Sequence, residues 1–471
     1  MAVIVDLYDS YIKYPSNEEL KENGKLAYLV YATPNMSSIC EYAGRTCYKS
    51  FGAIKEESYK KFISTIVGLG HESVIEHSNL IYIIFKNENV LLGKDTNDIN
   101  RDLVNVLSYN GLLKLTENQA FYTLSGNLRM FKDLVREYMH IRMKYNVNKF
   151  NKIIEDIMNS FYQLPKYYFE DMLKDGTLFQ VDKWVSNPKF NEADSLLQFK
   201  KLNDYVSIIN HDDFNFKVKG FATKENNELT VKRISMPQAI QFKHNRLTIQ
   251  IRAPRYITHQ LVRHRLASYS QTSQRYVKEE GNDVYIPEDI KANTVTDQTA
   301  RNFFNMSFRT YEGLIESGIN KEDARAVLTN ACMSNVIMTA TIEEFYHMVG
   351  LRSEKSAQNF FRDFIATPLK EYLDSYYSER TEDPINFAKK PKKEKVENKT
   401  GKDKYIKKLS NKNKIKNGKA ANNKPKQVKT KQDKHVTKKV VKNNTTKPVK
   451  KSTNKSSNGI KTYRGKQFKS K

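Results

Sequence analysis

One fourteen-residue segment, residues 263–276, carries the side chains of this chain best suited to bind an anion. It opens with Arg263-His264-Arg265 and closes with Arg275-Tyr276, and small hydroxyl and amide side chains fill the space between them. Arginine presents a planar fork that matches a phosphate group, while Ser, Thr and Gln complete the hydrogen bonding around phosphoryl or carbonyl oxygens. The segment therefore predicts a bound anion.

Two more arginines, Arg325 and Arg352, lie beside apolar helical patterns and extend the set of candidate anion ligands. Arginine also stacks on π-faces and hydrogen-bonds a carbonyl whose negative charge grows during a reaction. A nucleotide, or a uracil, flavin or folate ring, is the guest that such a set favours. No glycine-rich phosphate loop stands near a strand end, which disfavours the ATPase and Rossmann classes.

Two other interpretations of the 263–276 segment remain open from its residues alone. It is compatible with a solvated basic face, and with a nucleic-acid platform because Tyr256, Tyr269 and Tyr276 alternate with the arginines. The apolar pairs at 261–262 and 266–267 favour a closed pocket over an open groove.

The remaining candidate chemistry is weaker. Residues 71–77 contain two His and two Glu, but their spacing is not that of a zinc protease, so a turn stabilised by hydrogen bonds is expected and no metal site is predicted. Cys40 and Cys332 lie in apolar surroundings, whereas Cys47 follows an arginine and is the only nucleophile candidate. Three cysteines without paired spacing fit a reducing compartment.

The elements that must position these residues are predicted from apolar periodicity. The segment 88–240 is expected to be a mostly helical insertion between two neighbouring strands. The fold class is thus α+β, with a mixed or antiparallel sheet flanked by long helices. We expect strands at 80–85 and 247–252, and helices at 54–70, 256–266, 296–317, 320–331 (with Ala324, Val327, Leu328 and Ala331 inward) and 342–351.

The net charge of +26 resides in the last part of the chain. Residues 388–471 hold 31 Lys and Arg against four acidic residues, which leaves 48 basic and 49 acidic residues in 1–387. A segment with so few apolar residues is predicted to be disordered, either as a solvated tail or as a nonspecific binder of polyanions. The N-terminus shows no signal-peptide pattern, and no apolar stretch approaches membrane-spanning length, so a cytoplasmic protein without membrane contact is expected.

Four ordered blocks make the chain resemble the flavin-dependent thymidylate synthases. The first block is 70–77 (Gly-His-Glu-Ser-Val-Ile-Glu-His), and the second is 124–129, which occurs in longer members of the family. The third block is Arg-His-Arg at 263–265, followed after seven residues by Ser273. The fourth block comprises 324–330 and leads to Leu351-Arg352. The resemblance covers roughly residues 25–378, so 1–380 is expected to be the catalytic domain.

The resemblance implies an enzyme of nucleotide biosynthesis that methylates dUMP reductively to dTMP. It implies 5,10-methylenetetrahydrofolate as the carbon donor, FAD as the hydride carrier, NADPH as the reductant, and a homotetramer whose sites combine several subunits. No cysteine nucleophile is required. The alternative is a catalytically impaired homologue that binds nucleic acid through its basic tail.

Site residues are carried over from the resemblance position by position. Arg352 is expected to be the catalytic residue, because it matches the arginine that contacts uracil. The flavin contacts are expected at Ser73, Arg263, His264, Arg265, Gln271 and His347, with Thr341 and Glu343 standing where members commonly carry Asn-x-Arg. The dUMP contacts are expected at Gln260, Leu261, Val262, Arg263, Gln271, Thr272, Ser273, Gln274, Arg275, Arg325 and Arg352.

Overall fold

The computed structural model of the protein describes residues 11–13, 25–86, 104, 106–107, 113–117, 121–145, 151–179, 184, 186–187, 190, 197–214, 217–225, 228–235, 238–279, 281 and 283–378. These residues belong to one folded unit, Met1–Lys390. The lysine-rich segment 388–471 lies outside the described residues, and its disorder stays a prediction.

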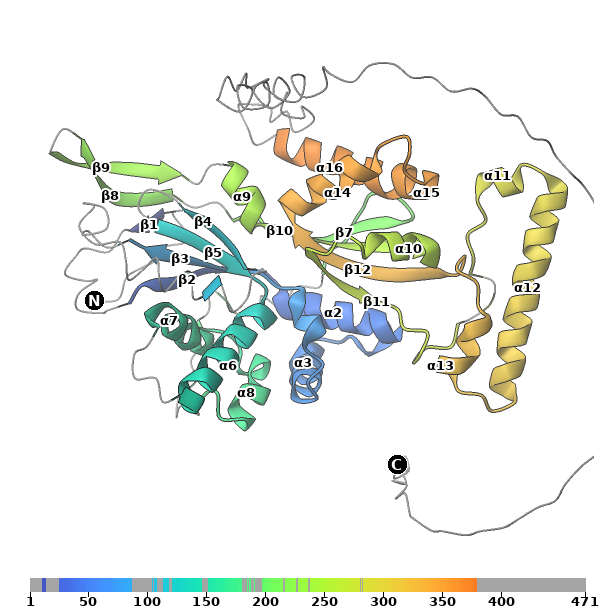
Figure 1. Ribbon diagram of the computed structural model, residues 1–471, viewed down its shortest axis with the longest axis horizontal. Helices are drawn as coiled ribbons and strands as arrows, with labels where there is room; N and C mark the ends of the chain where they lie inside the picture. Colours follow the sequence, from blue (N-terminus) through green and yellow to red (C-terminus); the bar gives the residue numbers. More distant parts are fainter. Residues whose placement is uncertain are drawn as a thin grey trace, which may run out of the picture. The chain divides into compact units, whose positions relative to one another are not determined.

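A four-stranded antiparallel sheet forms one side of this unit (Figure 1). Its order is β2-β3-β5-β4, and β3 and β5 are buried along their whole length because helices pack around them. The strands are β2 Ala27–Ala32, β3 Leu80–Phe85, β4 Lys114–Glu117 and β5 Phe121–Gly126. The helices of this core are α2 Met36–Tyr48, α3 Ser58–Gly68, α6 Leu128–Tyr145, α7 Lys152–Ser160 and α8 Glu170–Lys174.

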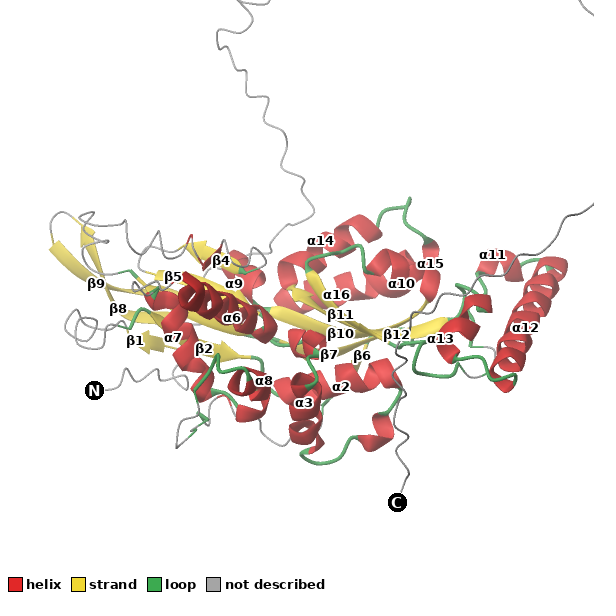
Figure 2. Ribbon diagram, turned by 60° about the horizontal axis from the view of Figure 1, so that its bottom comes forward, coloured by secondary structure: helices red, strands yellow, loops and turns green. Residues whose placement is uncertain are grey.

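A five-stranded antiparallel sheet, in the order β11-β12-β10-β7-β6, carries the second core. Its strands are β6 Lys200–Lys201, β7 Val206–His211, β10 Arg246–Pro254, β11 Ala267–Gln271 and β12 Met333–Thr341. The helices α10, α14, α15 and α16 cover one face of this sheet, and α2 lies on the opposite side (Figures 1 and 2). Their bounds are α10 Arg255–Leu261, α14 Ile342–Arg352, α15 Asn359–Phe361, the π-helical turn η8 Arg362–Ala366 and α16 Thr367–Ser378.

The third sheet is small, with the order β1-β8-β9, and its β1–β8 pair is parallel. Its strands are β1 Tyr11–Lys13, β8 Lys217–Glu225 and β9 Glu228–Ser235. The remaining helices are α9 Gln238–His244, α11 Glu288–Lys291, α12 Thr294–Glu316 and α13 Lys321–Ala324. The 3-10 turns are η2 Phe51–Ala53, η3 Glu72–Glu76, η4 Phe161–Gln163, η5 Lys166–Tyr168 and η7 Arg325–Val327.

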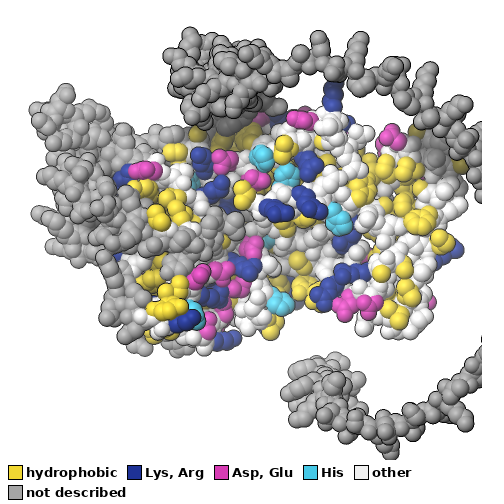
Figure 3. Space-filling view, in the orientation of Figure 1, with side chains coloured by type: hydrophobic (Ala, Val, Ile, Leu, Met, Phe, Trp, Pro, Cys, Tyr) yellow, Lys and Arg dark blue, Asp and Glu magenta, His cyan; other side chains and the backbone are white. Residues whose placement is uncertain are grey.

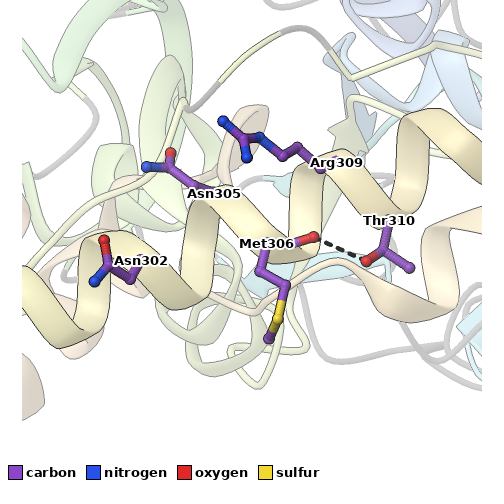
Figure 4. A pocket seen from close by; sticks show the side chains of 5 residues that line it. All are labelled: Asn302, Asn305, Met306, Arg309 and Thr310. Atoms are coloured by element: carbon purple, nitrogen blue, oxygen red, sulfur yellow. Dashed lines mark hydrogen bonds between the residues drawn. The ribbon is translucent and has the colours of Figure 1, made fainter.

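Helix α12 buries little of its surface. Asn293 caps it by accepting hydrogen bonds from the backbone of Val295 and Thr296, and the buried side chains of the helix are Ser307, Phe308 and Tyr311. One of its exposed faces borders a shallow hollow of about 440 Å³ lined by Asn302, Asn305, Met306, Arg309 and Thr310 (Figure 4). All five lining residues come from α12 itself, so the hollow is an open groove along a helix rather than an enclosed ligand site.

The α+β class with mainly antiparallel sheets and flanking helices is confirmed. The expected strand 80–85 coincides with β3, and the helices expected at 54–70, 296–317 and 342–351 correspond to α3, α12 and α14. Within the described ranges, none of the helices combines the length and apolar character that crossing a bilayer requires.

Three expectations need correction. The segment 88–240 is not simply a helical insertion, because β4 and β5 extend the first sheet and β7 pairs with β10 in the second. The helix expected at 256–266 ends at Leu261, where the Tyr269 hydroxyl donates to the Leu261 carbonyl. The helix expected at 320–331 is only α13 and a 3-10 turn, which leaves Val327 exposed.

Candidate active site

Helices α10 and α14 bring three of the expected site residues together. The Arg352 guanidinium, at the end of α14, donates from Nε to His264 Nε2 at 3.2 Å and from Nη1 to Gln260 Oε1 at 3.3 Å. Its Nη2 donates to the Gln260 carbonyl oxygen at 3.3 Å. Since a guanidinium has five N–H donors, two remain without a partner among the described residues. Arg352 is therefore held in place while part of its donor edge is available to a ligand.

His264 is neutral in this arrangement. Burial, followed by the positive charge of Arg352, lowers the pKa of His264 from 6.5 to about 4. Because its Nε2 accepts from Arg352, its proton is assigned to Nδ1, which faces Glu344 Oε1 at 3.9 Å. A neutral imidazole beside a guanidinium leaves the positive charge concentrated on Arg352, where an anionic carbonyl would be stabilised most.

A second group of expected residues gathers around Glu322. Arg275 donates from Nε and Nη2 to Glu322 Oε2 at 3.1 and 2.9 Å, and Arg325 donates from Nε to the Glu322 carbonyl oxygen at 3.0 Å. The Ser273 hydroxyl accepts from the backbone N–H of Arg275 at 3.2 Å. An exposed arginine (Arg275), a half-buried arginine (Arg325) and a hydroxyl thus lie at one place, where a phosphate would compete with the Glu322 carboxylate.

The expected dUMP residues between these groups lie mostly on strand β11 and at its end. Gln271 donates from Nε2 to Thr258 Oγ1 at 3.0 Å and to Ser334 Oγ at 3.1 Å, which ties β11 to α10 and β12. Thr272 is buried and bonds the Thr46 and Asn335 carbonyls, so its side chain supports the scaffold. Gln274 and Leu261 are buried as well, whereas Val262 is exposed.

The 71–77 segment is the hydrogen-bonded turn that its residues predicted. His77 is buried and contacts Ser270 and Thr339, while Lys132 binds Glu72 at 2.5 Å and Arg129 binds Glu76 at 2.5 Å. Burial lowers the pKa of Lys132 to about 8, against the opposing effect of Glu72. Helix α6 therefore fixes both carboxylates of the turn.

Ser73, the expected flavin contact of this turn, is exposed between those carboxylates. The His, Cys, Asp and Glu side chains of the described residues form no group of three or more that could hold a metal ion.

The other expected flavin contacts lie at the rim. The Arg263 and Arg265 side chains are exposed and make no hydrogen bond or ion pair with any described residue. His347 is exposed, and its ring centroid lies 6.4 Å from that of His264. Thr341 is buried and caps α14 by accepting from Glu344 N, and Glu343 pairs with Lys114 at 3.4 Å. The structure thus gives Thr341 a role in helix capping and places Glu343 in an ion pair.

Three residues of the Arg352 cluster were not expected from the sequence. Phe361 lies under the Arg352 guanidinium at 5.0 Å, Gln358 accepts a hydrogen bond from Gln260, and Glu344 faces His264. Burial raises the pKa of Glu344. The Thr341-x-x-Glu344 spacing is that of a helix capping box, and this signal would have placed Glu344 at the start of α14.

Comparisons with known proteins indicate a family. A family model described as thymidylate synthase complementing protein matches residues 28–87 and 207–373. These ranges include the 71–77 turn, the 263–276 segment, Arg325 and Arg352. Over these two ranges the chain matches this family. The unmatched residues between the two ranges, 88–206, include β4, β5, α6, α7 and α8.

Relatives of the family are named flavin-dependent thymidylate synthase. The protein of Thermococcus onnurineus is 36% identical over 26% of this chain and 51% of its own length. That of Pyrococcus abyssi is 29% identical over 40% of this chain and 68% of its own, and that of Geobacter sulfurreducens is 40% identical over 22% and 46%. The matched part of this chain thus spans about half the length of the first of these relatives.

Among solved structures, a UMP/dUMP methylase, PolB from Streptomyces cacaoi bound with 5-Br dUMP, shares 24% sequence identity over 29% of this chain and 68% of that chain. Its TM-score is 0.26.

Proposed function

We propose that this protein methylates dUMP to dTMP, with 5,10-methylenetetrahydrofolate as the carbon donor, FAD as the hydride carrier and NADPH as the reductant. The observation that carries the proposal is the Arg352 guanidinium. Gln260 and a neutral His264 hold it in place, and two of its N–H donors have no partner among the described residues. The match to the family, and the names of its relatives, supply the reaction class. The arginine at the uracil edge stabilises negative charge that develops on the ring carbonyl.

The donor set fits dUMP at both ends of the nucleotide. Gln260 and Arg352 provide an amide and a guanidinium for the base, and Ser273, Arg275 and Arg325 provide donors for the phosphate. Figure 3 shows Lys and Arg side chains gathered on the described surface of the body together with His. No cysteine takes part in the proposed chemistry, in agreement with the raised pKa values that burial gives the Cys47 and Cys332 thiols.

The residues present also fit a flavin. Arg263 and Arg265 are exposed cations beside the neutral His264, and the apolar side chains of Val262 and Leu266 are exposed next to them. We assign these cations to the phosphates and ring edge of FAD, together with Ser73, Gln271 and His347. FAD, when bound, supplies the hydride, and the chain's contribution is to position the rings and hold the charge.

The homotetramer that the resemblance implies is part of the proposal, as is a cytoplasmic location. Exposed apolar side chains on α12, with Val295 73%, Phe303 53% and Met306 59% exposed, offer surface that contact with a second copy of this chain would bury.

The purified protein is expected to be yellow with bound flavin and to form dTMP from dUMP, 5,10-methylenetetrahydrofolate and NADPH. Flavin absorbance and chromatographic detection of dTMP measure the two properties. Omitting dUMP or the folate in turn controls for background. A colourless protein that binds DNA and forms no dTMP would support the impaired, nucleic-acid-binding homologue instead.

Deleting residues 388–471 is expected to leave dTMP formation unchanged, because every residue assigned to the site lies before residue 353. The deletion removes the whole positive excess of the chain, so we expect it to abolish salt-dependent binding to DNA. Turnover and DNA retention are measured on both proteins at the same ionic strength. A collapse of turnover in the shortened chain would assign the tail a role in assembly or substrate capture.

A further inference from the structure

The two large sheets repeat one topology. Without the two-residue β6, the second sheet has the order β7-β10-β12-β11, and the first has the order β2-β3-β5-β4. In chain order, both sheets place their strands as first, second, fourth and third, with every neighbouring pair antiparallel. In both, the fourth strand leads directly into a helix, α6 or α14. We call residues 27–145 the first unit and residues 206–352 the second unit.

The pairing register agrees residue by residue between the units. Leu80 pairs with Gly126 and Leu247 with Ala340, which makes the second strands and the fourth strands equivalent. Both first strands carry an irregularity at the same place. In β2, Val30 has no partner on β3, because Leu29 pairs with Tyr82 and Tyr31 pairs with Ile81. In β7, Ile209 has no partner on β10, because Ile208 pairs with Ile249 and Asn210 pairs with Thr248. A backbone hydrogen bond just after the first strand is also repeated. Thr33 N donates to the Asn79 carbonyl in the first unit, and Asp212 N donates to the Arg246 carbonyl in the second, both at 2.9 Å.

The helices obey the same correspondence. Asn127 Oδ1 accepts from Met130 N at 2.9 Å at the start of α6, and Thr341 Oγ1 accepts from Glu344 N at 3.3 Å at the start of α14. Three turns later, Tyr138 stands in the first unit where Arg352 stands in the second. The equivalent buried pairs are Leu128 and Ile342, Phe131 and Phe345, Leu134 and Met348, and Val135 and Val349.

Two buried histidines, one from each unit, form equivalent hydrogen bonds to the other unit. His77 precedes the second strand of the first unit and bonds the second unit, through Nδ1 to Thr339 on β12 at 2.8 Å and through Nε2 to Ser270 on β11 at 2.9 Å. His244 precedes the second strand of the second unit and bonds the first unit. Its Nδ1 contacts Ser125 on β5 at 2.7 Å, and its Nε2 contacts Thr116 on β4 at 2.8 Å.

Each histidine thus uses the same ring nitrogen for the equivalent strand of the other unit. The pairing registers Ser270↔Ile337 and Thr116↔Thr123 place those two hydroxyls at equivalent positions. A reciprocal pair of contacts is what a twofold relation between two copies of one surface produces.

We propose that the chain contains two copies of one fold unit, related by a local twofold axis, and that only one of the two equivalent inter-unit contacts retains a nucleotide site. The retained contact is that of the 71–77 turn with β11, and its lost counterpart is the contact of α9 with β4. This inference rests on the proposed function for the identity of the nucleotide.

The residues at the two contacts differ as this inference requires. Strand β11 leads into Gln271, Ser273 and Arg275, and its unit ends at Arg352. At the counterpart contact, the register puts Ala239-Ile240 where the turn has Glu72-Ser73, and the buried Tyr138 replaces Arg352. The Tyr138 hydroxyl accepts from the backbone N–H of Asn151, the N-cap of α7, at 2.8 Å, so it joins α6 to α7 in the core around the first sheet. His77 is accordingly a positioning residue that fixes the strand carrying the substrate side chains.

The two histidines provide a matched experiment on the full chain. His77→Leu and His244→Leu remove equivalent buried hydrogen bonds, so both are expected to lower the melting temperature to a similar extent, by about 5 °C. Only His77→Leu is expected to weaken dUMP binding, by at least about tenfold, because it frees β11. Binding is measured by calorimetry, and His77→Gln, which restores an amide donor and acceptor, is expected to recover most of the affinity.

The outcomes separate the two proposals. Equal losses of dUMP affinity in the two leucine variants, or a large difference between their melting temperatures, would overturn the inference. If the unsubstituted protein binds no dUMP, the proposed function fails, while matched melting temperatures still support the duplicated architecture. If a leucine variant does not fold, the milder pair Ser270→Ala and Thr116→Val makes the same comparison at the hydroxyl partners.

Discussion

Arg352→Ala is expected to lower the rate of dTMP formation by at least about a hundredfold at saturating substrate, the usual cost of losing one charge-stabilising donor. The guanidinium is fixed by Gln260 and His264 and still offers donors to a ligand. The variant keeps a neutral His264, because burial is the largest cause of its lowered pKa. Steady-state dTMP formation, with flavin content measured in parallel, tests this expectation.

Arg362→Ala is the matched control for that substitution. Arg362 is also a partly buried arginine near the same cluster, but it bonds Asp363 and Asn359 and is not assigned to the site. Arg352→Lys keeps the positive charge and loses the planar fork, so we expect activity between that of the alanine variant and the unsubstituted protein. Full activity in Arg352→Ala, with normal flavin content, would remove this residue from the mechanism.

Some secondary-structure elements could be predicted from local sequence and others could not. Strand β3 was recognisable because six consecutive apolar residues, Leu80–Phe85, fill it, and α14 was recognisable from its helical period. Strand β11 was not expected, since Ser268, Ser270 and Gln271 read as ligand donors. Two of these side chains are buried against neighbouring elements. Hydroxyls that pair with a distant histidine give no local strand signal.

Strands β5 and β12 escaped prediction for a related reason. Their side chains are buried on both faces, so they show no alternation, and Thr, Ser and Gly interrupt the apolar run in β5. The contact of Arg352 with His264 and Gln260 joins residues about ninety positions apart. Only the resemblance to a family, and not spacing, brought these residues into one expected site.

The duplicated architecture was also invisible in the sequence. Equivalent positions share few residues, such as Leu80 with Leu247 and Phe131 with Phe345, because a buried position constrains size and polarity more than identity. What the units keep is the register, the skipped residue in the first strand and the crossed histidines. Function therefore diverged between the units at Tyr138 and Arg352 while the framework was retained.

The crossed histidines make acid stability the second large expected effect. Burial, with a contribution from Arg246, lowers the pKa of His77 from 6.5 to about 3, and burial and Lys243 do the same for His244. Well above pH 6.5 neither residue is protonated in either state. Between pH 6.5 and 3, only the unfolded chain takes up these protons, so the free energy of unfolding falls as the pH falls, by about 1.4 kcal/mol per pH unit for each histidine.

Urea unfolding at a series of pH values measures this slope. The double variant His77→Gln/His244→Gln cannot titrate at these positions, so its midpoint is expected to depend less on pH between 6.5 and 4.5 than that of the unsubstituted protein. The carboxylates of the chain are common to both proteins and cancel in the comparison. If the midpoints of the two proteins depend equally on pH, the two imidazoles are solvated in the folded protein. That result would contradict the buried inter-unit contacts on which the twofold relation depends.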